Sequence, residues 1–176
     1  MIAGKQILDA ADIDRMITRI TYEILERHKG VDDLALIGIH TRGVFIAKRI
    51  QEKIKSIEGE YVDTGEIDIT FYRDDWTSIG NHPVVRNTDI SFSVDKKKIV
   101  LVDDVLYTGR TIRSAMDALI DFGRPARIEL AVLVDRGFRE LPIQADYVGK
   151  FIKTTKSETV NIMMSEIDEK DHVVIK

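Results

Sequence analysis

Continuous runs of apolar residues predict three buried strands in this chain. Residues 34–39, 99–102 and 128–134 contain almost no polar side chains, which is typical of parallel strands covered on both faces. Residues 62–71 alternate in part between apolar and polar side chains and predict a further strand. Near the end, the short runs 160–164 and 173–175 are separated by a polar turn and predict a small antiparallel flap.

Apolar residues also recur at helical spacing in three segments. The first segment follows Asp9, a favourable N-cap residue, and ends before Gly30; the third ends before Gly123. The apolar positions are Ile13, Met16, Ile17, Ile20, Ile24 and Leu25, then Val44, Ile46, Ala47, Ile50 and Ile54, then Ile112, Ala115, Met116, Leu119 and Ile120. Strands that alternate with helices in this order predict an α/β fold with a mainly parallel sheet.

Composition narrows the class of protein. The 176 residues suffice for one domain with its own core, and no linker or repeat divides residues 1–176. The absence of cysteine excludes disulfides, cysteine-bound zinc and thiol nucleophiles. No apolar run reaches membrane-spanning length and no signal-peptide pattern opens the chain, so we expect a cytoplasmic protein without a membrane partner. A net charge of −4 gives no overall attraction to nucleic acid, so RNA binding would need a local basic patch.

A polar loop joins the strand at 99–102 to the helix after it. Residues 108–111 (Thr-Gly-Arg-Thr) offer hydroxyl groups, a closely approachable backbone and a cation at a helix N-terminus, which together suit a phosphate monoester. Asp103 and Asp104 would repel a phosphate, but carboxylates accept the hydroxyl protons of a ribose and bind Mg²⁺. Adjacent residues of a strand point to opposite faces, so we expect this pair to leave strand geometry in order to reach one ligand.

A second loop of the same kind, residues 40–43 (His-Thr-Arg-Gly), follows the strand at 34–39. It carries one fixed cation, Arg42, and two such loops side by side could hold both ends of a doubly phosphorylated ligand. His40 could serve as a general base, but a single histidine beside a phosphate loop is more often a bystander.

The first loop resembles the phosphoribosyl pyrophosphate (PRPP) signature of type I phosphoribosyltransferases, in which apolar residues, two acids and T-G-x-T follow one another. The resemblance implies the fold of that family: a mainly parallel sheet flanked by helices, an antiparallel hood and a flexible lid. It implies Mg²⁺ carried by PRPP, near Asp103 and Asp104 but with no protein ligand assigned, and pyrophosphate on the loop at 41–43. The PRPP-binding residues it implies are Thr41, Arg42, Gly43, Asp103, Asp104, Val105, Leu106, Tyr107, Thr108, Gly109, Arg110 and Thr111.

Residues 72–88 show no periodicity, and so long a stretch within a compact domain is typical either of a functional lid or of simple surface disorder. In the resembling family a flexible loop closes here over PRPP and excludes water. Tyr72, Arg73 and Arg86 are therefore candidates for the lid, with the two arginines meeting the pyrophosphate on closure.

Further stretches resemble one branch of the family, the PyrR-type pyrimidine operon attenuation regulators that are also uracil phosphoribosyltransferases. They are 65–75, 102–111, 130–142 and 145–149. This likeness implies the reaction of uracil and PRPP to UMP and pyrophosphate, binding of a leader-mRNA hairpin in the presence of UMP or UTP, and a homo-oligomer. The resemblance places uracil near Asp135, Tyr147 and Val148. Tyr107 stands where purine-specific relatives carry an aspartate, which disfavours a purine substrate.

The RNA-binding residues implied by the resemblance are Thr18, Arg19, Arg27, Arg139 and Lys150. Without the resemblance, the first three would belong to an ordinary solvated helix face. Tyr22, Phe138 and Gln144 depart from the basic or imidazole side chains of relatives, and each lost phosphate contact would weaken RNA binding and its salt dependence. Two alternatives therefore remain open beside the bifunctional protein: an enzyme without RNA regulation, and an RNA-binding regulator with vestigial catalysis.

Overall fold

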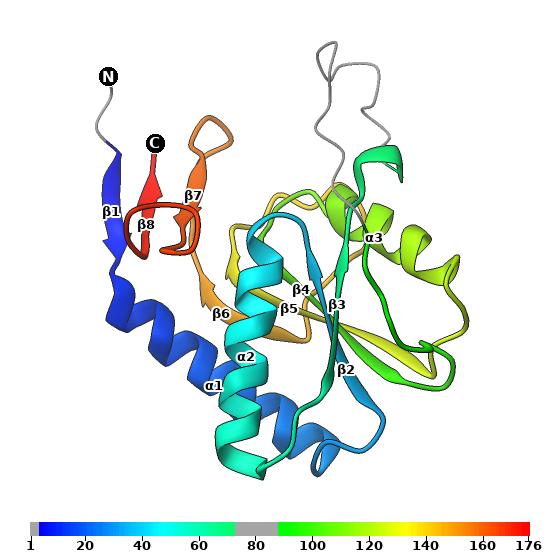
Figure 1. Cartoon of the computed structure of the whole chain (residues 1–176). Coiled ribbons are helices and arrows are strands. Elements are labelled where there is room, and N and C mark those ends of the chain that lie inside the picture. Colours follow the sequence, from blue (N-terminus) through cyan, green and yellow to red (C-terminus); the bar gives the residue numbers. More distant parts are fainter. Residues whose placement is uncertain (1–3, 73–87) are drawn as a thin grey trace.

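The computed structural model describes residues 4–72 and 88–176, in which a five-stranded parallel sheet forms the centre of the molecule (Figure 1). The strand order is β3-β2-β4-β5-β6, with all four pairs parallel. The strands are β2 Leu34–Ile39, β3 Asp63–Ile67, β4 Lys98–Leu106, β5 Arg127–Asp135 and β6 Tyr147–Phe151. The predicted α/β fold with a mainly parallel sheet is confirmed.

Helices cover both faces of this sheet, which explains why the central strands are apolar throughout. One core cluster joins α1 (Ala10–His28) and α2 (Arg42–Glu58) to one face through Leu36, Val100 and Leu133. The other cluster joins α3 (Arg110–Ile120) to the opposite face through Ile37, Leu101 and Val132. Successive strand residues therefore alternate between two buried layers.

The ends of the helices follow the predicted signals closely. Asp9 caps α1 through a reciprocal capping box with Asp12, whose backbone N–H donates to the Asp9 side chain at 2.8 Å. The helix ends at His28, and Lys29 rather than Gly30 is the first residue in the left-handed region, with φ of 55°. No helix among the described residues is both long and apolar enough to cross a membrane.

The antiparallel flap is also confirmed, but it has a strand that the sequence pattern did not indicate. Its order is β1-β8-β7, in which β7 (Val160–Met163) and β8 (His172–Ile175) are the two predicted tail strands. The additional strand β1 (Lys5–Leu8) pairs antiparallel with β8, so the two ends of the chain lie side by side (Figure 1). Only four residues long and without clear alternation, β1 gives little signal of its own.

The strand predicted at 62–71 was too long. The structure ends β3 at Ile67 and continues into a 3-10 turn, η1 (Thr70–Tyr72). Residues 88–90 lie beside β3, where Glu66 and Asp89 form an isolated antiparallel bridge. Arg73 and Arg86, the predicted lid arginines, lie outside the described residues.

Candidate functional site

The carboxyl ends of three neighbouring strands bring the predicted loops together. Residues 40–43 follow β2, residues 103–111 span the end of β4 and the start of α3, and Asp135 ends β5. Because β4 lies between β2 and β5 in a parallel sheet, the three segments meet at one edge, the usual ligand-binding edge of an open α/β sheet.

Gly43 brings the N-terminus of α2 into direct contact with β4. A Cβ atom at this glycine would lie 2.2 Å from the carbonyl oxygen of Val102 and 3.2 Å from the Cα atom of Asp103. No side chain fits that space, so glycine is required for the backbone of the second loop to approach the acid pair. This contact brings the start of α2 against the backbone of Val102 and Asp103, and Arg42 is close enough to lower the pKa of Asp104 electrostatically.

Asp103 and Asp104 both lie within β4, so the departure from strand geometry that a shared ligand would require is not present in the structure. β4 continues to Leu106, and each carboxylate folds back onto the next backbone N–H: Asp104 N donates to Asp103 at 2.9 Å and Val105 N donates to Asp104 at 2.7 Å. Burial raises the pKa of Asp103 well above its ordinary value, and the neighbouring charge of Asp104 raises it further. Burial also raises the pKa of Asp104, although Arg42 acts in the opposite direction.

Such a buried pair favours a cation or hydroxyl donors as its ligand. Among the described residues, no group of three or more His, Cys, Asp or Glu side chains is arranged to hold a metal ion. Two adjacent carboxylates nevertheless suit Mg²⁺, which usually keeps water and substrate oxygen atoms as its other ligands. Asp103 and Asp104 therefore fit a metal ion brought in by a phosphorylated substrate.

The start of α3 forms the predicted anion site. Gly109 adopts a φ of 93° at the N-cap position and has no side chain to cap the helix, so the N-terminus of α3 suits an anion. Thr108 Oγ1 accepts weakly from Arg110 N at 3.4 Å. The Arg110 side chain donates to Glu140 at 2.7 Å, so this cation is paired on the surface in the structure.

Tyr107 stacks against an arginine that sequence reasoning did not single out. The guanidinium carbon of Arg136 lies 4.1 Å from the centroid of the Tyr107 ring, and Phe138 contacts the same ring edge-on. Arg136 is only 7% exposed, and its Nε has no hydrogen-bond partner among the described residues. Its only sequence signal is its position directly after the end of β5.

Asp135 is held by Arg139 rather than left open. The Arg139 guanidinium donates to the Asp135 carboxylate, and also to the carbonyl oxygen atoms of Tyr107 and Ile143, each at 2.9 Å. The Asp135 carboxylate also accepts from Gly137 N at 2.9 Å. The structure thus places Arg139, predicted to bind RNA, against Asp135 at the carboxyl end of β5.

Tyr147 and Val148 are not brought to this end of β5. The Tyr147 hydroxyl donates to buried Glu129 at 2.6 Å, beneath α1, and His28 lies 2.8 Å from the same carboxylate. Burial would raise the pKa of Glu129, but Tyr147, His28 and Arg27 outweigh it and lower that pKa below its ordinary value of 4.5. Val148 pairs with Val132, three residues before the end of the strand.

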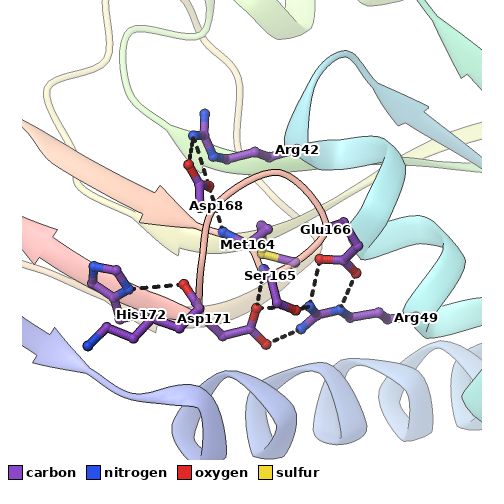
Figure 2. A network of polar contacts seen from close by, with 9 residues as sticks. Arg42, Arg49, Met164, Ser165, Glu166, Asp168, Asp171 and His172 are labelled. Atoms are coloured by element: carbon purple, nitrogen blue, oxygen red, sulfur yellow. Dashed lines mark hydrogen bonds and ion pairs between the residues drawn. The ribbon is translucent and has the colours of Figure 1, made fainter.

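Arg42 contacts the flap and acts electrostatically on Asp104. Figure 2 shows its guanidinium reaching Asp168, in the loop between β7 and β8, with Nη2 3.2 Å from the carboxylate. His40, two residues before Arg42, has its Nε2 3.3 Å from the Glu66 carboxylate and a side chain that is 15% exposed. Neither ring nitrogen of His40 has a hydrogen-bond partner among the described residues.

Tyr72, the one predicted lid residue that the structure describes, packs on α3. Its hydroxyl donates to Asp121 beyond the C-terminal end of the helix, and its carbonyl oxygen accepts from Ser114 at 3.0 Å. The hydrogen bond to Asp121 raises the pKa of the Tyr72 hydroxyl. The phenol therefore lies at the opposite end of α3 from the anion site.

The other predicted RNA residues share one face formed by α1 and the start of β6. A groove of about 430 Å³ is lined there by Arg15, Arg19 and Lys150. Arg19 donates to the carbonyl oxygen of Val148 at 3.0 Å and pairs with Glu23. Thr18 and Arg27 lie on the same helix. The Thr18 hydroxyl donates to the carbonyl oxygen of Asp14 at 2.8 Å. The Arg27 guanidinium pairs with Asp146 at 3.1 Å and with Glu129 at 3.2 Å.

Comparisons with known proteins agree with this arrangement. The family model "Phosphoribosyl transferase domain" matches residues 3–166. "Bifunctional protein PyrR" of Clostridioides difficile (strain 630) is 58% identical over 176 residues, covering 100% of this chain and 99% of the relative. The protein of the same name from Desulfosudis oleivorans is 57% identical over 170 residues, covering 96% and 94%.

Among solved structures, a hypoxanthine-guanine phosphoribosyltransferase from Bacillus anthracis matches with a TM-score of 0.74 at 16% identity, covering 97% of this chain and 96% of that one. A hypoxanthine phosphoribosyltransferase from Trypanosoma cruzi matches with a TM-score of 0.75 at 22% identity, covering 98% and 95%. At this level of identity, the likeness concerns the fold alone.

Proposed function

Because the chain belongs to the PyrR family of phosphoribosyltransferases, we propose that it joins a uracil phosphoribosyltransferase site at the carboxyl edge of the parallel sheet to an RNA-binding face on α1. It converts uracil and PRPP to UMP and pyrophosphate and regulates the pyrimidine operon. One domain, residues 1–176, carries both activities. A regulator of transcription acts where nascent RNA is found, so we place it in the cytoplasm.

PRPP lies across the two loops in this proposal. Its 5′-phosphate binds at the N-terminus of α3, residues 108–111, and its ribose hydroxyls donate to Asp103 and Asp104. Its pyrophosphate lies on the loop at 41–43, beside Arg42. The observation that carries the proposal is the close approach at Gly43, which brings the two loops together on either side of the acid pair.

The chemistry follows from the charges that these residues place around the ribose. Loss of pyrophosphate leaves positive charge at C1, which the neighbouring carboxylates stabilise, while Arg42 stabilises the departing polyanion. When bound with PRPP, Mg²⁺ supplies further positive charge to the pyrophosphate oxygen atoms. Tyr72, Arg73 and Arg86 stay the candidates for a lid that excludes water.

Uracil binds on the Tyr107 and Asp135 side of the ribose. The Tyr107 ring, held by Arg136, offers an uncharged flat surface where a purine-specific site would need an acid. Asp135 is already fixed by Arg139 and Gly137, so backbone groups around it can read the edge of the base. Val148 lies further from this end of the sheet. Tyr147 acts indirectly, because its hydrogen bond to Glu129 of β5 holds β6 in place.

Leader mRNA binds the α1 face when UMP or UTP is present. The groove is lined by Arg15, Arg19 and Lys150 and by one acid, Asp12, so positive charge predominates there on a chain of net charge −4, as phosphate contacts require. Thr18 and Arg27 extend this face along the helix. The proposal includes a homo-oligomer of dimeric or higher order.

Two assays test the proposal. Radiolabelled uracil with PRPP and Mg²⁺ should give UMP, and Arg42→Ala should raise the KM for PRPP about tenfold or more while leaving the affinity for UMP unchanged. A gel shift with the organism's pyrimidine-operon leader should require UMP or UTP and weaken steeply with salt. Absence of turnover would refute the enzymatic part, and absence of a nucleotide-dependent shift would refute the regulatory part.

A further inference from the structure

The loop between β7 and β8, residues 164–171, reaches from the flap to the pyrophosphate loop, as Figure 2 shows. Nη2 of Arg42 lies 3.2 and 3.4 Å from the two carboxylate oxygen atoms of Asp168. The two residues are 126 positions apart in the chain, and their side chains are 30% and 19% exposed. The flap therefore contributes an acid directly to the cation proposed to bind pyrophosphate.

This loop is held firmly on α2 by a second arginine two turns after the first. Arg49 donates from Nε and Nη2 to Glu166 at 2.8 and 2.7 Å, and from Nη1 to Asp171 at 2.6 Å. Hydrogen bonds to Asp171, and then to Glu166, raise the pKa of Arg49 in spite of its partial burial. Residues seven apart lie on the same side of a helix, so α2 fixes the loop with Arg49 and meets it again with Arg42.

The carboxylate of Asp168 is itself fixed before it meets Arg42. Its Oδ2 accepts from Met164 N at 2.8 Å, and Asp168 N donates to the carbonyl oxygen of Met164 at 2.6 Å. The backbone hydrogen bond from Met164 is also the main reason why the pKa of Asp168 is lowered, with Arg42 adding to it. A carboxylate anchored in this way stays ionised and does not move freely with the arginine.

Asp168 uses only one of the three guanidinium nitrogen atoms of Arg42. Nε of Arg42 is buried and has no hydrogen-bond partner among the described residues. The contact at 3.2 Å is longer than the 2.7–2.9 Å usual for a charged pair, so the arginine is oriented but not enclosed. One side of the guanidinium meets the acid, while the buried Nε donor is unpaired among the described residues.

We propose that Asp168 is a positioning residue for PRPP and pyrophosphate, which acts by holding Arg42 in the orientation that meets the departing pyrophosphate. The inference rests on the proposed role of Arg42. An arginine held in place before the ligand arrives loses less side-chain freedom on binding, and the ligand is bound more tightly for that reason. The flap would then serve the reaction from outside the parallel sheet.

Asp168→Asn is the sharpest test. The amide oxygen of the asparagine can still accept the hydrogen bond from Met164 N, but the negative charge that faces Arg42 is lost. We expect the KM for PRPP and the inhibition constant of pyrophosphate to rise about fivefold, within about 3- to 10-fold, for loss of a partly exposed charged contact. The KM for uracil and the affinity for UMP, which has no pyrophosphate, should not change. Asp168→Glu, which keeps the charge, should restore part of the loss.

Glu169→Gln is the matched control, because Glu169 is exposed in the same loop and its substitution also removes one negative charge. It should leave both constants unchanged. The substitutions are then combined with Arg42→Ala. If Asp168 acts through Arg42, Asp168→Asn has no further effect on PRPP in that background.

The outcomes separate this inference from the proposed function. If Arg42→Ala alone leaves the KM for PRPP unchanged, the proposed role of Arg42 fails. If that variant is impaired but Asp168→Asn is not, or binds pyrophosphate more tightly, the positioning role is overturned and the acid is a competitor or a bystander. An effect of Asp168→Asn that persists in the Arg42→Ala background is structural and also overturns it.

Discussion

Gly43→Ala tests whether the close approach of α2 to β4 creates the site. The added methyl group would lie 2.2 Å from the carbonyl oxygen of Val102, which belongs to the backbone of a central strand and cannot rotate away. Ordinary contact begins at 3.4 Å, so the N-terminus of α2 must recede by about 1.2 Å. Arg42, the preceding residue, must move with it.

The displacement should cost more in activity than in stability. Strain of this kind in a packed region costs about 1–3 kcal/mol, which lowers the melting temperature of a protein of this size by about 2–10 °C. A misplacement of about 1 Å in a residue that positions substrate can lower kcat/KM about 100-fold. We therefore expect a folded variant that has lost most of its turnover and most of its affinity for PRPP.

Gly59→Ala, at the other end of α2, is the control. A Cβ atom there would meet nothing within 4 Å, but φ is 80°, so alanine should cost about 1–2 kcal/mol without touching the site. Melting curves and kcat/KM for PRPP are measured for both variants. The reasoning is wrong if Gly43→Ala keeps kcat/KM within threefold of the unmodified protein, or if Gly59→Ala loses as much.

Three further results are expected. Asp103→Asn removes a charged hydrogen-bond acceptor for the ribose worth about 1.5–3 kcal/mol and should lower kcat/KM about 10- to 150-fold; an effect below about twofold would exclude that role. The lowered pKa of Glu129 contributes stability above its ordinary value of 4.5, which is lost as pH falls through the folded pKa, so Glu129→Gln should flatten the acid side of the stability profile in urea unfolding. Arg19→Gln should weaken leader-RNA binding and reduce its salt slope by about one, with uracil turnover unchanged; an unchanged slope would contradict the phosphate contact.

The parts of the fold that the sequence predicts well are those with strong local causes. Residues 34–39 and 128–134 read as buried strands because helices cover both sheet faces, and Asp9 is recognisable because its capping box lies within four residues. The candidate site is predictable to the same degree. Its two loops each follow an apolar strand directly, and parallel strands place such loops at one edge.

The contacts that the sequence did not predict join residues that lie far apart along the chain. The short strand β1 becomes recognisable only beside β8, and the contact of Arg42 with Asp168 joins residues 126 positions apart. Side-chain alternation predicts that Asp103 and Asp104 must leave the strand if both are to reach one ligand. The structure shows that each carboxylate is satisfied within the strand by the next backbone N–H, which side-chain alternation does not indicate.

The structure also bears on the departures from relatives at Tyr22, Phe138 and Gln144. Phe138 lies beside the Tyr107 ring, and Gln144 lines a cavity with Ile112 of α3, on the opposite face of the sheet from α1. Of the three, only Tyr22 lies on α1, where it is 55% exposed. The basic groove between α1 and β6 therefore keeps its cations whatever stands at 138 and 144, and these two departures weigh little against RNA binding at that groove. Tyr22→His is therefore the substitution that should increase the affinity for leader RNA in the gel shift. The gain should correspond to at most about one additional phosphate contact.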